Sequence, residues 1–366
     1  MSELKCKRRN GYLVCYPRRR NKTESIIGGI MLSLGIAVAI IMTISLFTSK
    51  QESFWVPRFA TEATSQSATQ TTKTSSQMPE TENEASKLRA VEHLNRIRDK
   101  EGIPPVQLID LNVARYRAEY LARTNLFSHY DSEGRHPGYW FSKLDSGLYG
   151  VEENLMEWYV TDAHSLPRSI AKVNYTDAVY RLVFDDASSN WGHRDSLLDP
   201  CHNYVAMATS YFWNRTYGAR YYVIYMVAKW VEWVSPPRYE GGRFTAEGYA
   251  APEMKPKYFA VYYAKYESNP ASRHSYDVGD LYLCKYLDPP LPCKGVQAPT
   301  GVFAVEKMQD GRWHIKINTS VALDRPGLYT FEIIAEDLRG IKWKPMSPWG
   351  DARVGKCRIM EYTVAK

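Results

Sequence analysis

One uncharged stretch near the N-terminus constrains this chain more than any other feature. It runs from Ile26 to Phe47, and Gly, Ser and Thr are its only weakly polar residues. A helix of this length, rising about 1.5 Å per residue, spans about 33 Å, enough for a bilayer core of about 30 Å. A cleaved signal peptide has a shorter apolar region and a small-residue cleavage site, whereas this stretch leaves through Thr48-Ser49-Lys50. The sequence therefore predicts an uncleaved signal-anchor, a transmembrane helix over residues 26–47.

The charges before this helix predict its orientation. The first 24 residues hold eight Lys or Arg against two Glu, and the formal net charge of the whole chain is +7. Because basic flanks stay on the cytoplasmic side of a membrane, we expect a cytoplasmic basic tail over residues 1–25 and extracellular domains beyond the helix. Two cysteines in this tail, Cys6 and Cys15, are too few for a zinc site on their own, and reduced or lipid-modified thiols are expected. The basic charge reflects membrane orientation, and no nucleic-acid partner is expected.

Composition divides the extracellular part into a stalk and two folded domains. Residues 48–86 are rich in Ser, Thr, Gln and Glu, a composition that cannot bury a core, so a disordered Ser/Thr-rich stalk is predicted. Helical and strand patterns then fill residues 87–233, and Ser235-Pro236-Pro237 indicates a boundary. Residues 238–366 form a β-rich accessory domain in this interpretation.

The first folded domain combines helices and strands. Leu88, Val91 and Leu94 recur at helical spacing, and Gly102 ends that helix. A second helix begins at Leu111, with Asp110 as its expected N-cap, and ends near Asn125. A third helix is predicted over 177–184, and core strands over 204–211 and 219–233. These elements make an α+β domain.

The second folded domain contains short β-like runs separated by turn signals. Their regular spacing predicts a small all-β domain, a β-sandwich. The runs cover residues 258–263, 280–286, 302–305, 313–317, 328–335 and 357–364.

Four cysteines follow the predicted transmembrane helix, and four cysteines allow three pairings. Cys284 and Cys293 flank a Pro-rich loop and are favoured by their closeness in the chain. Cys201 and Cys357 would then tie the two domains together. We also expect a glycoprotein, because three Asn-x-Ser/Thr sequences lie on the extracellular side. They begin at Asn174, Asn214 and Asn318.

Two histidine-containing stretches, about sixty residues apart, carry a resemblance to a known family. Phe127-Ser128-His129 precedes Glu153-Asn154-Leu155, and Gly192-His193-Arg194 precedes Leu197-Leu198-Asp199-Pro200. Leu94-Asn95-Arg96-Ile97-Arg98 and Gly102-Ile103-Pro104-Pro105-Val106 come earlier, in the same order as in that family. The chain thus resembles the CAP (SCP-like) superfamily of cysteine-rich secretory proteins, antigen 5 and pathogenesis-related 1 proteins, in its prokaryotic form, over residues 87–232. The resemblance implies an α-β-α sandwich with a cleft.

The resemblance also implies which side chains line that cleft. His129 and His193 match the two histidines of the family, and Glu153 matches one of its two acidic residues. The other lies in the helix before the second histidine, so Asp185 or Asp186 is the candidate. Glu152 stands where the family usually has Gly, which leaves open whether Glu152 or Glu153 points inward. Asp131 and Asn154 are expected beside the cleft.

Two functional interpretations follow from this set. Two imidazoles and two carboxylates can hold Zn²⁺ or another divalent metal, or they can form a hydrogen-bonded network that only holds the cleft together. No Ser or Cys lies in a nucleophile-elbow sequence and no His-Glu-x-x-His helix is present, so catalysis is disfavoured. We expect a membrane-anchored protein with a binding or adhesion role toward an extracellular protein, lipid or polysaccharide. The alternative is a metal-dependent, peptidase-like hydrolase acting on extracellular or envelope material, with its metal held by His129, His193 and Glu153.

Overall fold

A computed structural model describes residues 4–9, 12–17, 80–160, 174–213, 218–273, 275–348 and 350–366. They belong to two compact units, residues 1–74 and residues 75–366. In the first unit, β1 (Leu4–Arg9) and β2 (Tyr12–Pro17) form an antiparallel hairpin in which Cys6 is opposite Cys15. The transmembrane helix predicted over 26–47 and most of the predicted stalk lie outside the described residues. Among the helices that are described, none is long and apolar enough to cross a membrane.

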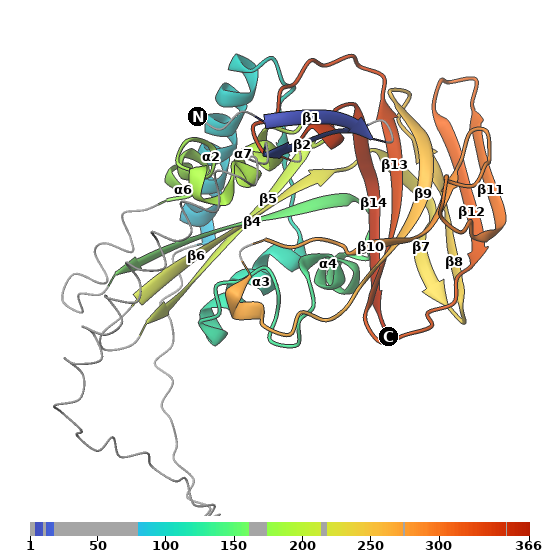
Figure 1. Ribbon diagram of the computed structural model, residues 1–366. Helices are drawn as coiled ribbons and strands as arrows, with labels where there is room; N and C mark the ends of the chain where they lie inside the picture. The colour runs from blue at the N-terminus through green and yellow to red at the C-terminus, as the bar shows by residue number, and fades with distance from the viewer. Residues whose placement is uncertain are drawn as a thin grey trace, which may run out of the picture. The chain divides into compact units, whose positions relative to one another are not determined.

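The second unit begins with a four-stranded sheet between two helical layers (Figure 1). Its strand order is β3-β5-β6-β4, with β3 parallel to β5 and the other pairs antiparallel. The strands are β3 (Gln107–Leu108), β4 (Gly150–Val160), β5 (Tyr204–Trp213) and β6 (Gly218–Ala228). We refer to residues 80–228 as the α-β-α part.

The central strand β6 explains why this sheet is covered on both faces. Every residue of β6 is buried, which is typical of a strand with helices on both sides. Tyr222, Ile224 and Met226 belong to one hydrophobic core, whereas Val223 and Tyr225 belong to the other. The helices of the first core are α2 (Glu80–Lys100), α6 (Tyr175–Phe184) and α7 (Gly192–Leu198), and those of the second are α3 (Asn112–Thr124) and α4 (Pro137–Asp145).

Two helix starts differ from the sequence-based expectation. α2 begins at Glu80, within the residues assigned to the stalk. Asp110 does not cap α3, whose N-cap is Leu111 without a side-chain hydrogen bond. The Asp145 carboxylate takes that role from outside the helix. It accepts hydrogen bonds from the first two backbone N–H groups of α3, at 3.0 and 2.8 Å.

The C-terminal part consists of two four-stranded sheets that share one core. Their strand orders are β10-β9-β13-β14 and β11-β12-β8-β7, so the predicted sandwich is present. The strands of the first sheet are β9 (Met254–Ala264), β10 (Asp280–Tyr286), β13 (Leu328–Asp337) and β14 (Lys356–Ala365). Those of the second are β7 (Val231–Glu240), β8 (Arg243–Ala250), β11 (Thr300–Lys307) and β12 (Trp313–Ser320). We call residues 231–366 the sandwich.

The expected boundary at Ser235-Pro236-Pro237 lies inside a strand. β7 runs through these residues, and its pairing with β8 shifts register on both sides of Ser235. Proline is tolerated there because β7 is an edge strand and the shifts mark bulges. The prolines therefore do not separate the domains, and the sandwich begins at Val231.

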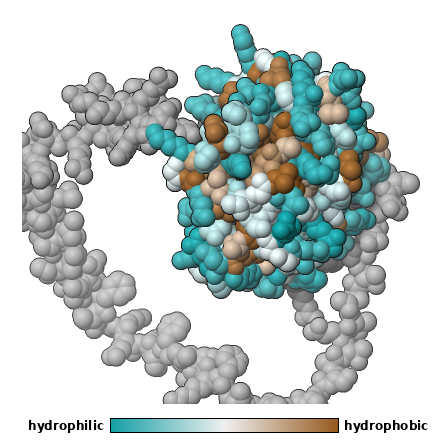
Figure 2. Space-filling view, turned by 90° about the vertical axis from the view of Figure 1, so that its right-hand side faces the viewer, coloured by the Kyte–Doolittle hydropathy of each residue, from teal (hydrophilic) through white to brown (hydrophobic). Residues whose placement is uncertain are grey.

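Covalent and packing contacts join the α-β-α part to the sandwich within one unit. Cys201 forms a disulfide with Cys357, and Cys284 with Cys293, the pairings expected from the sequence. Trp343, from the connection between β13 and β14, packs into the core of α2, α6 and α7. Figure 2 shows the face of the sandwich that is turned away from the helices of the α-β-α part. Hydrophobic residues occur there in small groups among hydrophilic ones.

Candidate functional site

Two connections bring the candidate site residues together. His129 follows α3, which ends at Asn125 in a left-handed conformation. His193 lies in the first turn of α7, which begins after Trp191, also left-handed. The two imidazole ring centroids are 6.5 Å apart. The two histidine stretches therefore form one site.

Glu153, on β4, is the most tightly held residue of this site. Its carboxylate accepts hydrogen bonds from Arg117 Nε at 2.8 Å and from the Tyr225 hydroxyl at 2.7 Å, and it lies 3.0 Å from His129 Nδ1. The side chains of Arg117 and Glu153 are fully buried. Burial alone would raise the pKa of Glu153, but Arg117 and His129 outweigh it and lower that pKa to about 2. Glu153 is therefore ionised, and its oxygens are committed to protein partners.

A second carboxylate holds the other imidazole. Asp186, which follows α6, lies 2.7 Å from His193 Nδ1. It also accepts hydrogen bonds from the Arg194 backbone N–H at 3.0 Å and from the Ser189 hydroxyl. Burial favours the protonated acid, but the contacts with His193 and Ser189 outweigh it and lower the pKa of Asp186. Like Glu153, Asp186 acts as an anionic acceptor for one ring nitrogen.

These carboxylates determine the tautomers of the two imidazoles. An ionised carboxylate can only accept, so each Nδ1 must carry the proton. Burial lowers the pKa of His129 more than Glu153 raises it, so this ring is neutral near pH 7. In these tautomers the Nε2 atom of each ring carries the lone pair. The site thus offers two nitrogen acceptors whose orientation is fixed by carboxylates.

The donor set does not fit a resident zinc ion. Structural zinc takes four protein ligands and catalytic zinc three, but the described residues contain no group of three His, Cys, Asp or Glu able to share a metal. Two imidazoles bound to one tetrahedral zinc have ring centroids about 5 to 5.5 Å apart, so the observed 6.5 Å would have to shorten by about 1 to 1.5 Å. Only the two Nε2 atoms are suited to a cation, and two ligands give weak, exchangeable binding.

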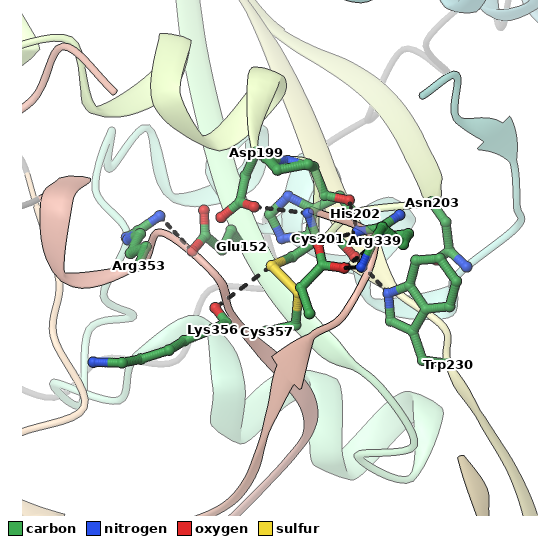
Figure 3. The surroundings of a disulfide bond; sticks show 12 residues. Glu152, Asp199, Cys201, His202, Asn203, Trp230, Arg339, Arg353, Lys356 and Cys357 are labelled. Carbon is green, nitrogen blue, oxygen red and sulfur yellow. Dashed lines mark hydrogen bonds and ion pairs between the residues drawn. A yellow bond between two sulfur atoms is a disulfide. The ribbon is translucent and has the colours of Figure 1, made fainter. Parts of the chain in front are cut away.

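Glu152 points away from the imidazoles and binds the sandwich. Its carboxylate lies 2.6 Å from Arg353 and 3.5 Å from Arg358. Figure 3 shows Glu152 facing Arg353 beside the Cys201–Cys357 disulfide. Burial opposes ionisation, but Arg353 and its neighbours lower the pKa of Glu152 to about 2. Glu153 is therefore the residue beside His129, and Glu152 is an interdomain contact.

Arg358 is shared by several buried carboxylates at this junction. Besides Glu152, it lies 2.9 Å from Glu332 and 2.8 Å from Glu361. Burial, together with the neighbouring carboxylates, raises the pKa of Glu361 to about 7 and also raises that of Glu332. Arg353 and Arg358 supply two guanidinium groups for three carboxylates, so a proton is retained among the acids near neutral pH.

Three other expected site residues lie elsewhere. Asp131 is buried, but it binds Arg135 Nε at 2.6 Å and Trp140 Nε1 at 2.9 Å, which orders its own loop. Asn154 donates to the Ser196 hydroxyl at 2.9 Å and so ties β4 to α7. Asp185 is an exposed C-cap of α6. Alternation along β4 and the end of α6 explain why the neighbours of Glu153 and Asp186 point away from the imidazoles.

The glycosylation candidates have different surroundings. Asn174 is exposed and caps α6 through a capping box with Asp177. Asn318 lies on β12 and accepts a hydrogen bond from Arg243 at 2.7 Å. Asn214 lies outside the described residues.

Sequence reasoning missed Arg117, Tyr225 and Tyr276. Tyr276, from the connection between β9 and β10, has its ring centroid 5.0 Å from that of His129. Arg117 could have been predicted from the sequence. It lies beside Ala118 on the apolar face of α3, and an arginine buried on such a face requires an anionic partner. No sequence pattern predicts Tyr276, because its contact with His129 joins the sandwich to the α-β-α part.

Part of the chain is structurally similar to known proteins. No protein family matches the sequence, and no curated protein matches it. An extracellular protein containing an SCP domain from Bacillus anthracis overlaps at a TM-score of 0.26 and 13% identity, covering 41% of this chain and 45% of that one. The CAP domain of enterococcal PrgA overlaps at a TM-score of 0.28 and 18% identity, covering 45% and 69%. The chain spans less than half of the length of the Bacillus protein.

Proposed function

We propose that this chain is a membrane-anchored extracellular protein of CAP type that binds a ligand at the His129–His193 site. The order of the CAP-like motifs supports the family assignment, and so does the meeting of the two histidine stretches at one place. The disulfides Cys201–Cys357 and Cys284–Cys293 support an oxidising, extracellular location. The apolar stretch 26–47 supplies the membrane anchor in this proposal.

Both site carboxylates, those of Glu153 and Asp186, are occupied by protein partners. This favours a binding function over catalysis. A hydrolase needs a free general base or nucleophile near the reacting atom. Here Glu153 is held by Arg117, Tyr225 and His129, and Asp186 by His193 and backbone. In the described part of the chain, no hydroxyl or thiol is hydrogen-bonded to either site imidazole. What remains for a ligand is a pair of imidazole acceptors.

This pair accepts hydrogen bonds or a cation. Lone pairs on two Nε2 atoms bind hydroxyl, amine or amide donors, and they also bind a divalent metal weakly. Glu153 is compensated by Arg117, whereas the nearest described partners of Asp186 are an imidazole, a hydroxyl and a backbone N–H. The site therefore favours neutral or cationic donors, such as groups on an extracellular protein, lipid or polysaccharide.

Titration with Zn²⁺ tests the proposal without knowledge of the ligand. We expect the full-length protein in detergent to bind one Zn²⁺ with micromolar or weaker affinity in calorimetry, and His193→Ala to lose this binding. His314→Ala is the matched control, because His314 also contacts a carboxylate, that of Glu247, at 3.1 Å on the sandwich.

Polysaccharides, lipid vesicles and extracellular proteins are then assayed for capture that depends on His193. Absence of any His193-dependent binding would refute the proposed function. Cleavage of peptide or envelope substrates that requires Zn²⁺ and His193 would instead establish the hydrolase alternative.

A further inference from the structure

We propose that Tyr276 is a positioning residue of the His129–His193 site, so that the sandwich is part of that site. The inference rests on the binding function proposed above and identifies how the accessory domain contributes to it. Tyr276 belongs to the connection between β9 and β10, more than a hundred residues beyond His129 in the chain.

Tyr276 lies between a fixed imidazole and a site imidazole. Its ring centroid is 5.0 Å from that of His129 at an interplanar angle of 49°, and 6.2 Å from that of His136 at 16°. His136 is fully buried and contacts Thr330 Oγ1 at 3.3 Å through Nε2. Burial lowers the pKa of His136 to about 4, so its ring is neutral near pH 7. The tyrosine ring therefore fixes the position of the His129 ring from the sandwich side.

The Tyr276 hydroxyl also holds the backbone of Glu153. It accepts a hydrogen bond from the Glu153 N–H at 3.2 Å. β4 is an edge strand, so this N–H would otherwise have no strand to pair with. The next outward group of the same edge, the Val151 carbonyl, accepts from Arg358 at 3.1 Å. Glu153 is thus held at its carboxylate by the α-β-α part and at its backbone by the sandwich.

The loop that carries His129 is tied to the same connection. Ser128 donates its hydroxyl hydrogen to the Pro270 carbonyl at 2.7 Å, and the Glu267 N–H donates to the Gly134 carbonyl at 3.0 Å. Gly134 has φ +77°, and a β-carbon there would lie 2.3 Å from the Glu267 carbonyl oxygen. This close approach needs glycine. The sandwich therefore fixes both the loop and the strand that form the His129–Glu153 pair.

A conservative substitution isolates the hydroxyl. In the full-length protein, Tyr276→Phe removes the acceptor of the Glu153 N–H but keeps the ring, and Tyr276→Leu also removes the ring. We expect Tyr276→Phe to change the ring ¹⁵N shifts of His129 in the absence of metal and to weaken Zn²⁺ binding roughly three- to tenfold, the effect of one neutral hydrogen bond. Tyr276→Leu should have the larger effect on both. Tyr282→Phe is the control, because its hydroxyl contacts the Ala322 carbonyl within the sandwich.

The two readouts separate this inference from the proposed function. If wild-type protein shows no His193-dependent binding of Zn²⁺ or of any other probe, the proposed function is refuted, while the metal-free ¹⁵N shifts of His129 still decide the role of Tyr276. Wild-type shifts in Tyr276→Phe would refute the positioning role. Should Tyr276→Leu fail to fold, Tyr276→Phe alone decides. A loss of thermal stability without any change at His129 would make Tyr276 a packing residue only.

Discussion

Two disulfides among the described residues close loops of very different length, which leads to a quantitative prediction. Cys201 and Cys357 are 156 residues apart, whereas Cys284 and Cys293 are 9 apart. The loss of conformational entropy that a cross-link imposes on the unfolded chain grows with the logarithm of loop length, giving about 5 kcal/mol for the longer loop and about 2.6 kcal/mol for the shorter. The interdomain disulfide should therefore stabilise the fold about twice as much.

Paired alanine substitutions test this prediction. Urea unfolding of residues 75–366, followed by tryptophan fluorescence, gives the free energy of unfolding for Cys201→Ala/Cys357→Ala and for Cys284→Ala/Cys293→Ala. Cys201 and Cys357 are both nearly inaccessible to solvent, so lost packing adds to the larger effect. An equal or smaller loss for the interdomain pair would refute the reasoning, because it would mean that the junction is held without the cross-link.

Three further substitutions test the packing and charge of the junction and site. Arg117→Met should cost about 3–5 kcal/mol of folding free energy because it leaves the Glu153 carboxylate buried and unpaired; combining it with Glu153→Gln should recover part of that loss in urea unfolding, and no recovery would contradict the pairing. The pKa of Glu361 is raised to about 7. Its protonated form therefore contributes fully to the free energy of unfolding below about pH 4.5, and this contribution is lost as the pH rises through 7. The melting temperature of Glu361→Gln should therefore equal that of wild type at pH 4.5 and exceed it at pH 8. The reverse order would be evidence against the raised pKa of Glu361. Gly150→Ala should lower stability by about 1–3 kcal/mol, since its β-carbon would lie 1.8 Å from a backbone oxygen of β14, whereas Gly192→Ala, which meets nothing within 4 Å, should be neutral or stabilising in the same thermal melts.

Local sequence patterns predicted the helices with a regular apolar face and the strand that is fully buried. Apolar residues at helical spacing predicted α2, α3 and α6, because they recur with the period of the buried helix face. The continuous apolar run around Val223 predicted β6. β4 was missed as a strand. Its Glu152-Glu153-Asn154 sequence is a poor β-former, and the strand is held by pairing with β6 and by side chains of the sandwich.

The histidines and one acid of the candidate site were predictable, but their supports were not. His129, His193 and Glu153 came from ordered motifs, which are visible in a sequence. The choice of Asp186 over Asp185 depends on where α6 ends, and helix ends are uncertain by a residue or two. Tyr276 could not be assigned, because no pattern in the chain relates the β9–β10 connection to the loop that carries His129.

The capped edge of β4 has a consequence for how the protein can be divided. Without the sandwich, the Val151 carbonyl and the Glu153 N–H would lose their partners Arg358 and Tyr276. An exposed edge of this kind is a template for strand addition by another chain. We therefore expect a truncation after β6 to expose this edge and to oligomerise, because the sandwich covers the edge in the full-length protein.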